Sequence, residues 1–511
     1  PYTTLFRSAS GAAPTRGGGK SLLGIILAAV VLLGGGGFGL SSILGGSDST
    51  DTSSAYTQSV TATQSAASKS SGYSASTGSA SASGSTASSA SALTGLLSGL
   101  GASNSASYGN VSTGWSNPAN TRQLNTNVAS GARDKRTQIL GGGQDTVTIM
   151  VYMCGTDLES KYGMGTADLQ EMAAATLSDK VNVIVYTGGC KQWKNNTVSS
   201  SVNQIYKVEN GGLRCLQSNA GTDSMVKPAT LTSFIQFCAQ NYPANRNELI
   251  LWDHGGGSLS GYGYDEKNAA AGSMNLAGIQ TALKNAGLSF DFIGFDACLM
   301  ATLENALMLT DYADYLIASE ETEPGVGWYY TNWLTNLSAN TSLSTLDVGK
   351  NIIDDFVSVC DQKCAGQKTT LSLIDLAELE ATVPEAFKTF ASGTSELLQS
   401  NDYQAVSSAR SSTREFATSS KIDQIDLVDL AYNLGTQEGQ ALAETLLGAV
   451  KYNNTSSSIT NAYGISIYFP YQKTSKVNSA VATYSAIGID DEYARCIQQF
   501  ASLESAGQSA S

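Results

Sequence analysis

Residues 248–257 read ELILWDHGGG, and residues 291–300 read DFIGFDACLM. Each stretch begins with a run of mostly apolar residues and then turns to glycine or to residues that carry chemistry. Apolar runs without alternation are typical of strands that are buried on both faces of a parallel sheet. We therefore expect two buried strands, with His254 directly after the first and Cys298 shortly after the second.

The sequence on either side of these stretches alternates between strand-like and helix-like segments. Strands are also predicted at 147–153, 181–186 and 315–318, and helices at 167–177, 231–241, 277–286 and about 300–309. This alternation predicts an α/β fold, with a largely parallel sheet flanked by helices on both faces. Sites in open sheets of this kind lie at the carboxyl ends of the strands, so the residues that follow each strand are candidates for function.

The N-terminal part differs in composition from the rest of the chain. Residues 1–20 form an N-terminal segment whose first eight residues resemble a translated sequencing adapter, and we expect those eight to be foreign to the protein. Residues 21–44 contain no charged side chain, which predicts a transmembrane helix or signal anchor, with a cleaved signal peptide as the alternative. Residues 45–112 are rich in Ser and predict a disordered stalk.

Charges around the apolar segment predict how the chain lies in a membrane. Basic residues precede it and Asp residues follow it. By the positive-inside rule, we expect a single-pass protein of the cell membrane with an extracellular C-terminal domain, or a protein secreted after signal cleavage.

Globular composition begins near residue 113. We expect a core at 113–345 and a mostly helical C-terminal subdomain at 346–505, in which 371–376 and 464–469 are strand-like. This second part is either a separate subdomain or an extension of the same sheet.

Composition limits the chemistry that the chain can perform. Its one histidine excludes His-rich zinc sites and a helical H-E-x-x-H site. The net charge is −14, and because residues 1–140 hold 8 of the 29 basic and 3 of the 43 acidic residues, the remainder carries −19. An acidic body argues against a nucleic-acid partner and favours basic ligands, although solubility alone is the alternative.

His254 and Cys298 are the residue types of an acyl-transfer site. A thiol is nucleophilic as the thiolate, and a neighbouring imidazole lowers the pKa of the thiol. Gly255 leaves its backbone N–H open to a carbonyl oxygen, as an oxyanion hole requires. The alternatives are a buried structural cysteine and a histidine that merely ends a strand at a glycine turn.

Taken together, the motifs resemble the clostripain family of cysteine peptidases. The resemblance covers about 115–500 and rests on TVTIMVYMCGTDLES (146–160), ELILWDHGGG (248–257), FDFIGFDACLMATLENA (290–306) and SEETEPGVGWYY (319–330). It implies a caspase-like fold and an endopeptidase that cleaves basic peptides or proteins after Arg or Lys at P1. It also implies a catalytic dyad of His254 and Cys298.

The resemblance further implies that Asp296 meets the basic P1 side chain in the S1 pocket. Residues i and i+2 of a strand share a face, so Asp296 can share the crevice with Cys298, although a helix N-cap is the alternative for this Asp. The segment after the strand at 315–318 offers further subsite candidates, with a solvated loop or core packing as the alternative. These candidates are Glu320, Glu321, Glu323 and Trp328.

Family members often mature by internal cleavage between the His and Cys segments. In that interval Lys284 lies in a predicted helix, whereas Lys267 lies in the polar and small-residue stretch YDEKNAAAG. Loops of this composition are the preferred sites of proteolytic cleavage. We therefore predict self-cleavage after Lys267.

Cofactors and partners are less constrained. We assign no metal ligands and no cofactor, and calcium is left open because some family members depend on it and no EF-hand loop is present. The eight cysteines form no C-x-x-C pair, and we predict few or no disulfides. We expect a monomer that contacts the membrane through its N-terminal helix.

The alternative function is a stalk-mounted adhesin or binding module on an inactive peptidase fold. The intact His254 and Cys298 argue against this alternative.

Overall fold

The computed structural model describes residues 123–400, 402–471 and 474–510. The expectations for the adapter-like residues, the apolar segment and the Ser-rich stalk fall outside these residues. Within the described ranges, none of the helices is both long enough and apolar enough to cross a membrane.

The main sheet of the described residues has nine strands in the order β11-β8-β7-β6-β5-β1-β2-β3-β4. Its five middle strands run parallel, and two antiparallel strands flank them at each edge. The strands are β1 (Val147–Cys154), β2 (Val181–Gly188), β3 (Gln204–Glu209), β4 (Gly212–Gln217), β5 (Arg246–Trp252), β6 (Phe290–Asp296), β7 (Ala313–Ala318), β8 (Thr370–Asp375) and β11 (Val450–Thr455).

The five parallel strands are those expected from their apolar runs, so the predicted α/β fold with a largely parallel sheet is confirmed. The C-terminal part extends this sheet through β8 and β11. It also forms a second, three-stranded sheet of order β12-β10-β9. The strands of this small sheet are β9 (Glu415–Phe416), β10 (Gln424–Asp426) and β12 (Ser466–Tyr468).

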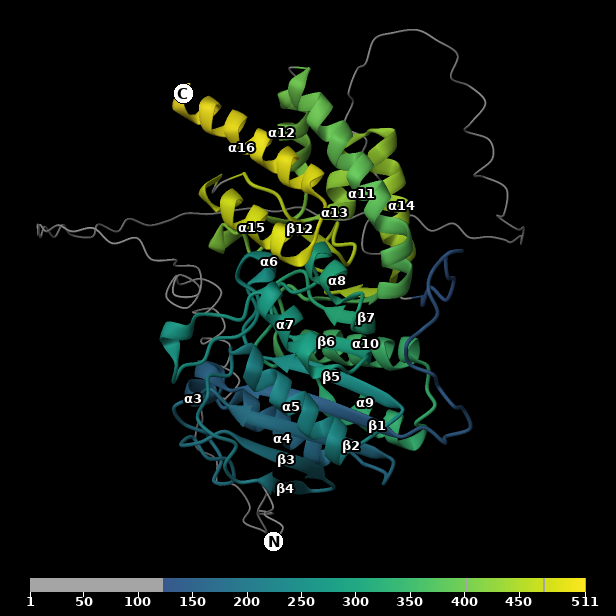
Figure 1. The fold of residues 1–511 in the computed structure, drawn as a ribbon, viewed down its shortest axis with the longest axis vertical. Helices are drawn as coiled ribbons and strands as arrows, with labels where there is room; N and C mark the ends of the chain where they lie inside the picture. The colour runs from purple at the N-terminus through teal and green to yellow at the C-terminus, as the bar shows by residue number, and fades with distance from the viewer. Residues whose placement is uncertain (1–122, 401, 472–473, 511) are drawn as a thin grey trace, which may run out of the picture. The chain divides into compact units, whose positions relative to one another are not determined.

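Helices cover both faces of the large sheet (Figure 1). The face that includes Ile149 and Val151 of β1 packs against α4 (Met164–Ala174), α9 (Tyr330–Ala339) and α10 (Thr345–Lys363), with α3 (Thr156–Tyr162) beside them. The other face, which includes Met150 and Tyr152, shares one hydrophobic core with the remaining helices. These are α5 (Pro228–Asn241), α6 (Gly257–Ser260), α7 (Leu276–Ala286), α8 (Leu303–Leu309), α11 (Leu376–Gln399), α12 (Tyr403–Ser412), α13 (Leu427–Leu434), α14 (Gln437–Ala449), α15 (Val477–Ile487) and α16 (Asp491–Ala510).

The alternation along β1 follows from strand geometry, in which successive side chains point to opposite faces. Both faces are apolar because both are covered, which explains why the strands read as continuous apolar runs. The short loops that leave the carboxyl ends of β1, β5 and β6 therefore meet at one edge of the sheet, which is where the candidate site lies.

Candidate active site

The loops that carry His254 and Cys298 follow neighbouring strands. β5 and β6 pair in parallel with Trp252 opposite Asp296, and the Asp253 N–H donates to the Asp296 carbonyl at 3.3 Å. A Cβ atom at Gly255 would lie 1.9 Å from the Cys298 carbonyl oxygen, so only glycine fits against this backbone. The structure thus brings the two predicted loops into direct contact.

The imidazole of His254 is held by a carboxylate that sequence reasoning did not identify. His254 Nε2 lies 2.8 Å from Asp157 Oδ1, and Asp157 is the second residue of α3, three residues after the end of β1. Asp253 instead accepts from the backbone N–H groups of His254 and Tyr264, at 2.6 and 2.7 Å. Asp157 therefore orients the ring, whereas Asp253 orients the backbone.

The surroundings of His254 stabilise the imidazolium form of its ring, which is the form it takes on accepting a proton. Burial alone lowers the pKa of its imidazole, but the hydrogen bond to Asp157 and the charges of Asp253 and Asp157 outweigh burial and raise that pKa above its usual value. Burial raises the pKa of Asp157 in turn, yet the hydrogen bond and charge of His254, together with those of Lys161, lower it well below its usual range. With Nε2 engaged by Asp157, Nδ1 is the nitrogen left to exchange a proton with the crevice.

The thiol of Cys298 is protonated at rest. Burial and the charge of Glu323 raise the pKa of Cys298 to about 12, although the Glu323 N–H, 3.2 Å from Sγ, opposes the rise. In the resting structure, burial and the charges of neighbouring acids therefore dominate the pKa of this thiol.

The C-terminal part supports the turn after Cys298. Leu299 has a φ of 71°, a left-handed conformation that is rare outside glycine and must be stabilised by its surroundings. Its side chain packs in a cluster with Phe416 and Ile459, and its carbonyl accepts from Gln424 Nε2 at 3.0 Å. The small sheet therefore belongs to the architecture of the site.

Two backbone N–H groups lie beside the thiol, those of Gly255 and Cys298. Within the described part of the chain, no hydrogen bond engages the N–H of Gly255 or that of Cys298 with another residue. Unengaged N–H groups next to a nucleophile are what an oxyanion hole requires.

Three acidic side chains gather beneath Cys298 on the face covered by α4 and α9. Asp296, at the end of β6, accepts from Tyr330 Oη at 2.8 Å and from the Trp328 N–H at 3.2 Å. Asp168 of α4 accepts from Trp252 Nε1 at 2.6 Å. Their oxygens both lie beside Gly327, where a Cβ atom would be 3.1 Å from Asp296 Oδ1 and 3.3 Å from Asp168 Oδ2.

The third member of this acidic cluster is Glu323, whose carboxyl interacts with that of Asp296. Burial raises the pKa of Asp296 to about 6, and it raises those of Asp168 and Glu323 well above their usual values, with the charge of Asp296 adding to the rise for both. None of the three forms an ion pair within the described residues, and Glu323 Oε1 is buried without a hydrogen-bond partner. The charge of Lys363, whose Nζ lies 3.8 Å from Glu171, opposes the rise in the pKa of Asp168.

Comparison with known proteins identifies the family. The model of the clostripain family, peptidase family C11, matches residues 151–502. This chain belongs to the clostripain family. Clostripain from Hathewaya histolytica is 27% identical over an alignment of 233 residues, and the match covers 39% of this chain and 44% of that protein, which is less than half of the relative. The resemblance inferred from the four motifs is confirmed.

Solved structures of two clostripain-family proteins share the fold. The inactive zymogen C11 protease from Parabacteroides distasonis has a TM-score of 0.52 and 20% identity, covering 67% of this chain and 99% of that one. The secreted C11 cysteine protease iotapain from Bacteroides thetaiotaomicron has a TM-score of 0.51 and 18% identity, with the same coverage of both chains. The expected caspase-like fold with a mostly helical C-terminal part is therefore confirmed.

The other subsite candidates that follow β7 are Glu320, Glu321 and Trp328. Trp328 is fully buried and packs against Gly294, which favours the alternative of core packing for its ring. Glu320 is also fully buried, and its Oε2 accepts from the Gly464 N–H beneath the small sheet. Glu321 accepts from the Ala417 N–H at 2.9 Å. Both carboxylates therefore accept from the backbone of the C-terminal part, and the charge of Glu321 also helps to raise the pKa of Cys298.

Lys267 lies in the loop between α6 and α7 and is exposed. Its Nζ donates to the carbonyls of Ser200 and Ser201 at 2.6 and 3.2 Å, and its own N–H donates to Asp265. Lys267 therefore lies on the surface, where the peptide bond that follows it is accessible to a peptidase.

The described residues contain neither a cluster of metal ligands nor a disulfide. In residues 123–510, apart from the undescribed gaps, no three His, Cys, Asp or Glu side chains are arranged to hold a metal ion, and calcium dependence stays open. All eight cysteines are free.

Proposed function

We propose that this protein is a cysteine endopeptidase that cleaves peptides and proteins after Arg or Lys. Cys298 is the nucleophile, His254 is the general base and then the general acid, and Asp157 positions the imidazole. The observation that carries the proposal is the acidic cluster of Asp168, Asp296 and Glu323 directly beneath the paired loops of His254 and Cys298.

The reaction begins from a neutral thiol, because burial raises the pKa of Cys298 to about 12. As Sγ attacks the carbonyl carbon, its proton passes to Nδ1 of His254, and Asp157 stabilises the imidazolium that forms. The N–H groups of Gly255 and Cys298 receive the developing oxyanion. His254 then protonates the leaving amine, and water hydrolyses the thioester in the second half of the reaction.

A basic P1 side chain suits the acidic cluster for an electrostatic reason. Buried carboxyls that lie close together repel one another when ionised, so their pKa values rise. A guanidinium or ammonium group placed among them would offset that repulsion and would satisfy the unpartnered Glu323 Oε1. Substrates without a positive P1 side chain gain none of this stabilisation.

The charge state of Asp296 predicts a pH dependence that tests the proposal. Its pKa is raised to about 6, so the carboxylate is ionised above that pH and is neutralised as the pH falls through it. The ratio of kcat/KM for an Arg peptide to kcat/KM for its citrulline counterpart should fall below about pH 6, approaching tenfold per pH unit. Because both peptides use the same His254 and Cys298, the ratio isolates the S1 site. A ratio that is constant between about pH 5 and pH 8 would contradict the assignment.

Self-processing after Lys267 is part of the same proposal. The exposed loop position and the basic residue support it. In the active protein, Lys267→Gln should leave the chain uncut at the Lys267–Asn268 bond, whereas the Cys298→Ala variant should remain uncut with Lys267 in place. Intact-mass measurement of both variants checks this. Wild-type protein that is active as one unbroken chain would show that cleavage here is not required.

We further propose that the enzyme acts outside the cell, either tethered by the apolar segment at 21–44 or released after signal cleavage, and that it acts as a monomer. The alternative function, a binding module on an inactive peptidase fold, predicts no turnover of any Arg or Lys peptide by the wild-type protein.

A further inference from the structure

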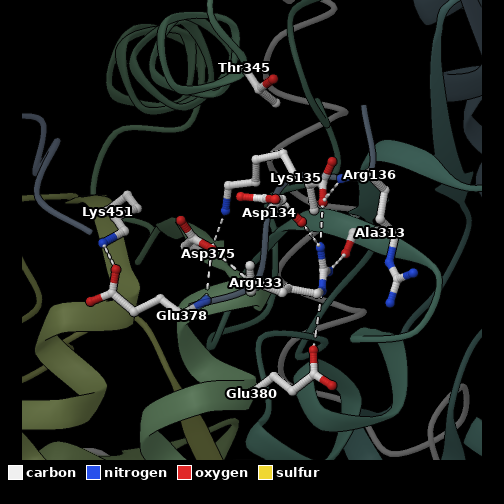
Figure 2. A network of polar contacts seen from close by, with 12 residues as sticks. Arg133, Asp134, Lys135, Arg136, Ala313, Thr345, Asp375, Glu378, Glu380 and Lys451 are labelled. Carbon is white, nitrogen blue, oxygen red and sulfur yellow. Dashed lines mark hydrogen bonds and ion pairs between the residues drawn. The ribbon is translucent and has the colours of Figure 1, made fainter. Parts of the chain in front are cut away.

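A short basic segment precedes the catalytic core, and its side chains are engaged by the body of the protein. Residues 133–136 read Arg-Asp-Lys-Arg. Figure 2 shows the side chains of Arg133 and Lys135 directed at carboxylates of the C-terminal part. Arg133 Nε donates to Glu380 at 3.1 Å, and its Nη2 donates to the carbonyls of Thr310 and Ala313 at 3.0 and 2.8 Å.

Asp314 holds the segment most firmly. Its Oδ1 accepts from Arg133 Nη1 at 2.8 Å and from the Arg136 N–H at 2.9 Å, and its Oδ2 accepts from the Thr137 N–H at 2.8 Å. Asp314 itself is fully buried at the start of β7. One carboxylate thus fixes both a basic side chain and the backbone on either side of the Arg136–Thr137 peptide bond.

Lys135 is engaged from a different element. It forms an ion pair with Asp375, the last residue of β8, and its Nζ lies 4.4 Å from the centre of the Tyr315 ring. The side chains of Arg133 and Lys135 are only 22% and 28% exposed, and both residues are partly buried, whereas Arg136 is an exposed residue. Lys267 is also exposed, and its ammonium contacts carbonyl oxygens instead of carboxylates.

We propose that the peptide bonds after Arg133, Lys135 and Arg136 form a second, latent processing site of this enzyme, which Asp314 keeps closed. The inference rests on the proposed Arg/Lys specificity. A peptidase accepts an extended chain, so a segment fixed through its backbone must open before water can add across its peptide bonds to give a carboxylate and an amine. Cleavage there separates the catalytic body from everything that precedes the cut.

The closing role of Asp314 is tested with trypsin, which also cleaves after Arg and Lys, on full-length protein carrying Cys298→Ala so that self-cleavage is absent. Adding Asp314→Asn should raise the rate of cleavage within 133–137 at least about tenfold, because charge-assisted hydrogen bonds to the backbone and to Arg133 are lost. Cleavage at Lys267 in the same molecules should not change and serves as the internal reference. The matched control is Asp311→Asn, since Asp311 is 75% exposed and reaches Arg136 only at 3.8 Å.

Two further measurements keep the outcomes distinct. Glu380→Gln, which removes a half-exposed partner of Arg133, should raise cleavage a few-fold even if Asp314→Asn reduces folding. No rise with either variant overturns the closed-site proposal. The active protein with Asp314→Asn should then cut itself within 133–137. If trypsin cuts this opened segment and the active enzyme leaves it intact, the latent site is not one of its own processing sites, and the proposed Arg/Lys specificity is tested separately by peptide turnover.

Discussion

Replacing His254 by Ala should lower kcat/KM for an Arg peptide by at least about 1,000-fold, without a compensating second base. The chain contains one histidine, so no other imidazole is present to accept the thiol proton. The effect should be large because the pKa of Cys298 is raised to about 12, so spontaneous ionisation at neutral pH supplies very little thiolate. Steady-state turnover of a fluorogenic peptide measures the loss.

Asp157→Asn should cause a smaller loss of activity than His254→Ala. An amide in place of the carboxylate keeps the volume but removes the charge that stabilises the imidazolium, so kcat should fall about 10- to 100-fold with little change in KM. The pKa of His254 should also fall, since the hydrogen bond and charge of Asp157 raise it in the wild type. If Asp157→Asn had wild-type kcat and an unshifted pH profile, Asp157 would have no positioning role, and if His254→Ala retained most activity, the base assignment would be wrong.

The second large effect is expected at Asp296. Asp296→Asn should lower kcat/KM for Arg and Lys peptides about 100-fold or more, while turnover of a peptide with a neutral P1 residue changes only a few-fold. The side chain keeps its size and its neighbours Tyr330 and Trp328, so the change isolates the charge. Paired peptides that differ only at P1 provide the measurement.

Asp145→Asn provides a matched control, because Asp145 is a buried carboxylate before β1, at the opposite end of the strand from the site. It should not change the ratio between basic and neutral P1 peptides. If Asp296→Asn lowered turnover of both peptides equally, Asp296 would have a structural role, and the specificity would have to reside in Asp168 or Glu323.

The main sheet was largely predictable because burial on both faces leaves a strong signal. The runs at 147–153 and 181–186 contain few polar residues, and the structure extends each by one or two residues. The hairpin of β3 and β4 was not predicted, although Asn210-Gly211 between them is a frequent hairpin turn. β11 could not be predicted in this way, because Asn453 and Asn454 are buried through hydrogen bonds to distant partners.

The candidate site was predictable only where a residue follows a recognisable motif. Asp296 is the last residue of β6, and His254 and Cys298 each lie two residues after the end of a strand. Asp157 follows β1 in the same way and would have been found by applying the crevice rule to every strand. Asp168 lies within α4, and nothing in the local pattern distinguishes it from a solvent-facing helical carboxylate, because its position is set by how the helix packs on the sheet.

The most direct test of the central claim uses a peptide with Arg at P1 and a thiol-reactive ketone in place of the scissile bond. Because the protein has eight free cysteines, seven of them serve as internal controls for reactivity. We predict that one equivalent labels Cys298 alone, that the norleucine counterpart labels it at least about 100-fold more slowly, and that His254→Ala reacts poorly. Labelling of another cysteine, or equal rates with Arg and norleucine, would contradict the proposed nucleophile or the proposed specificity.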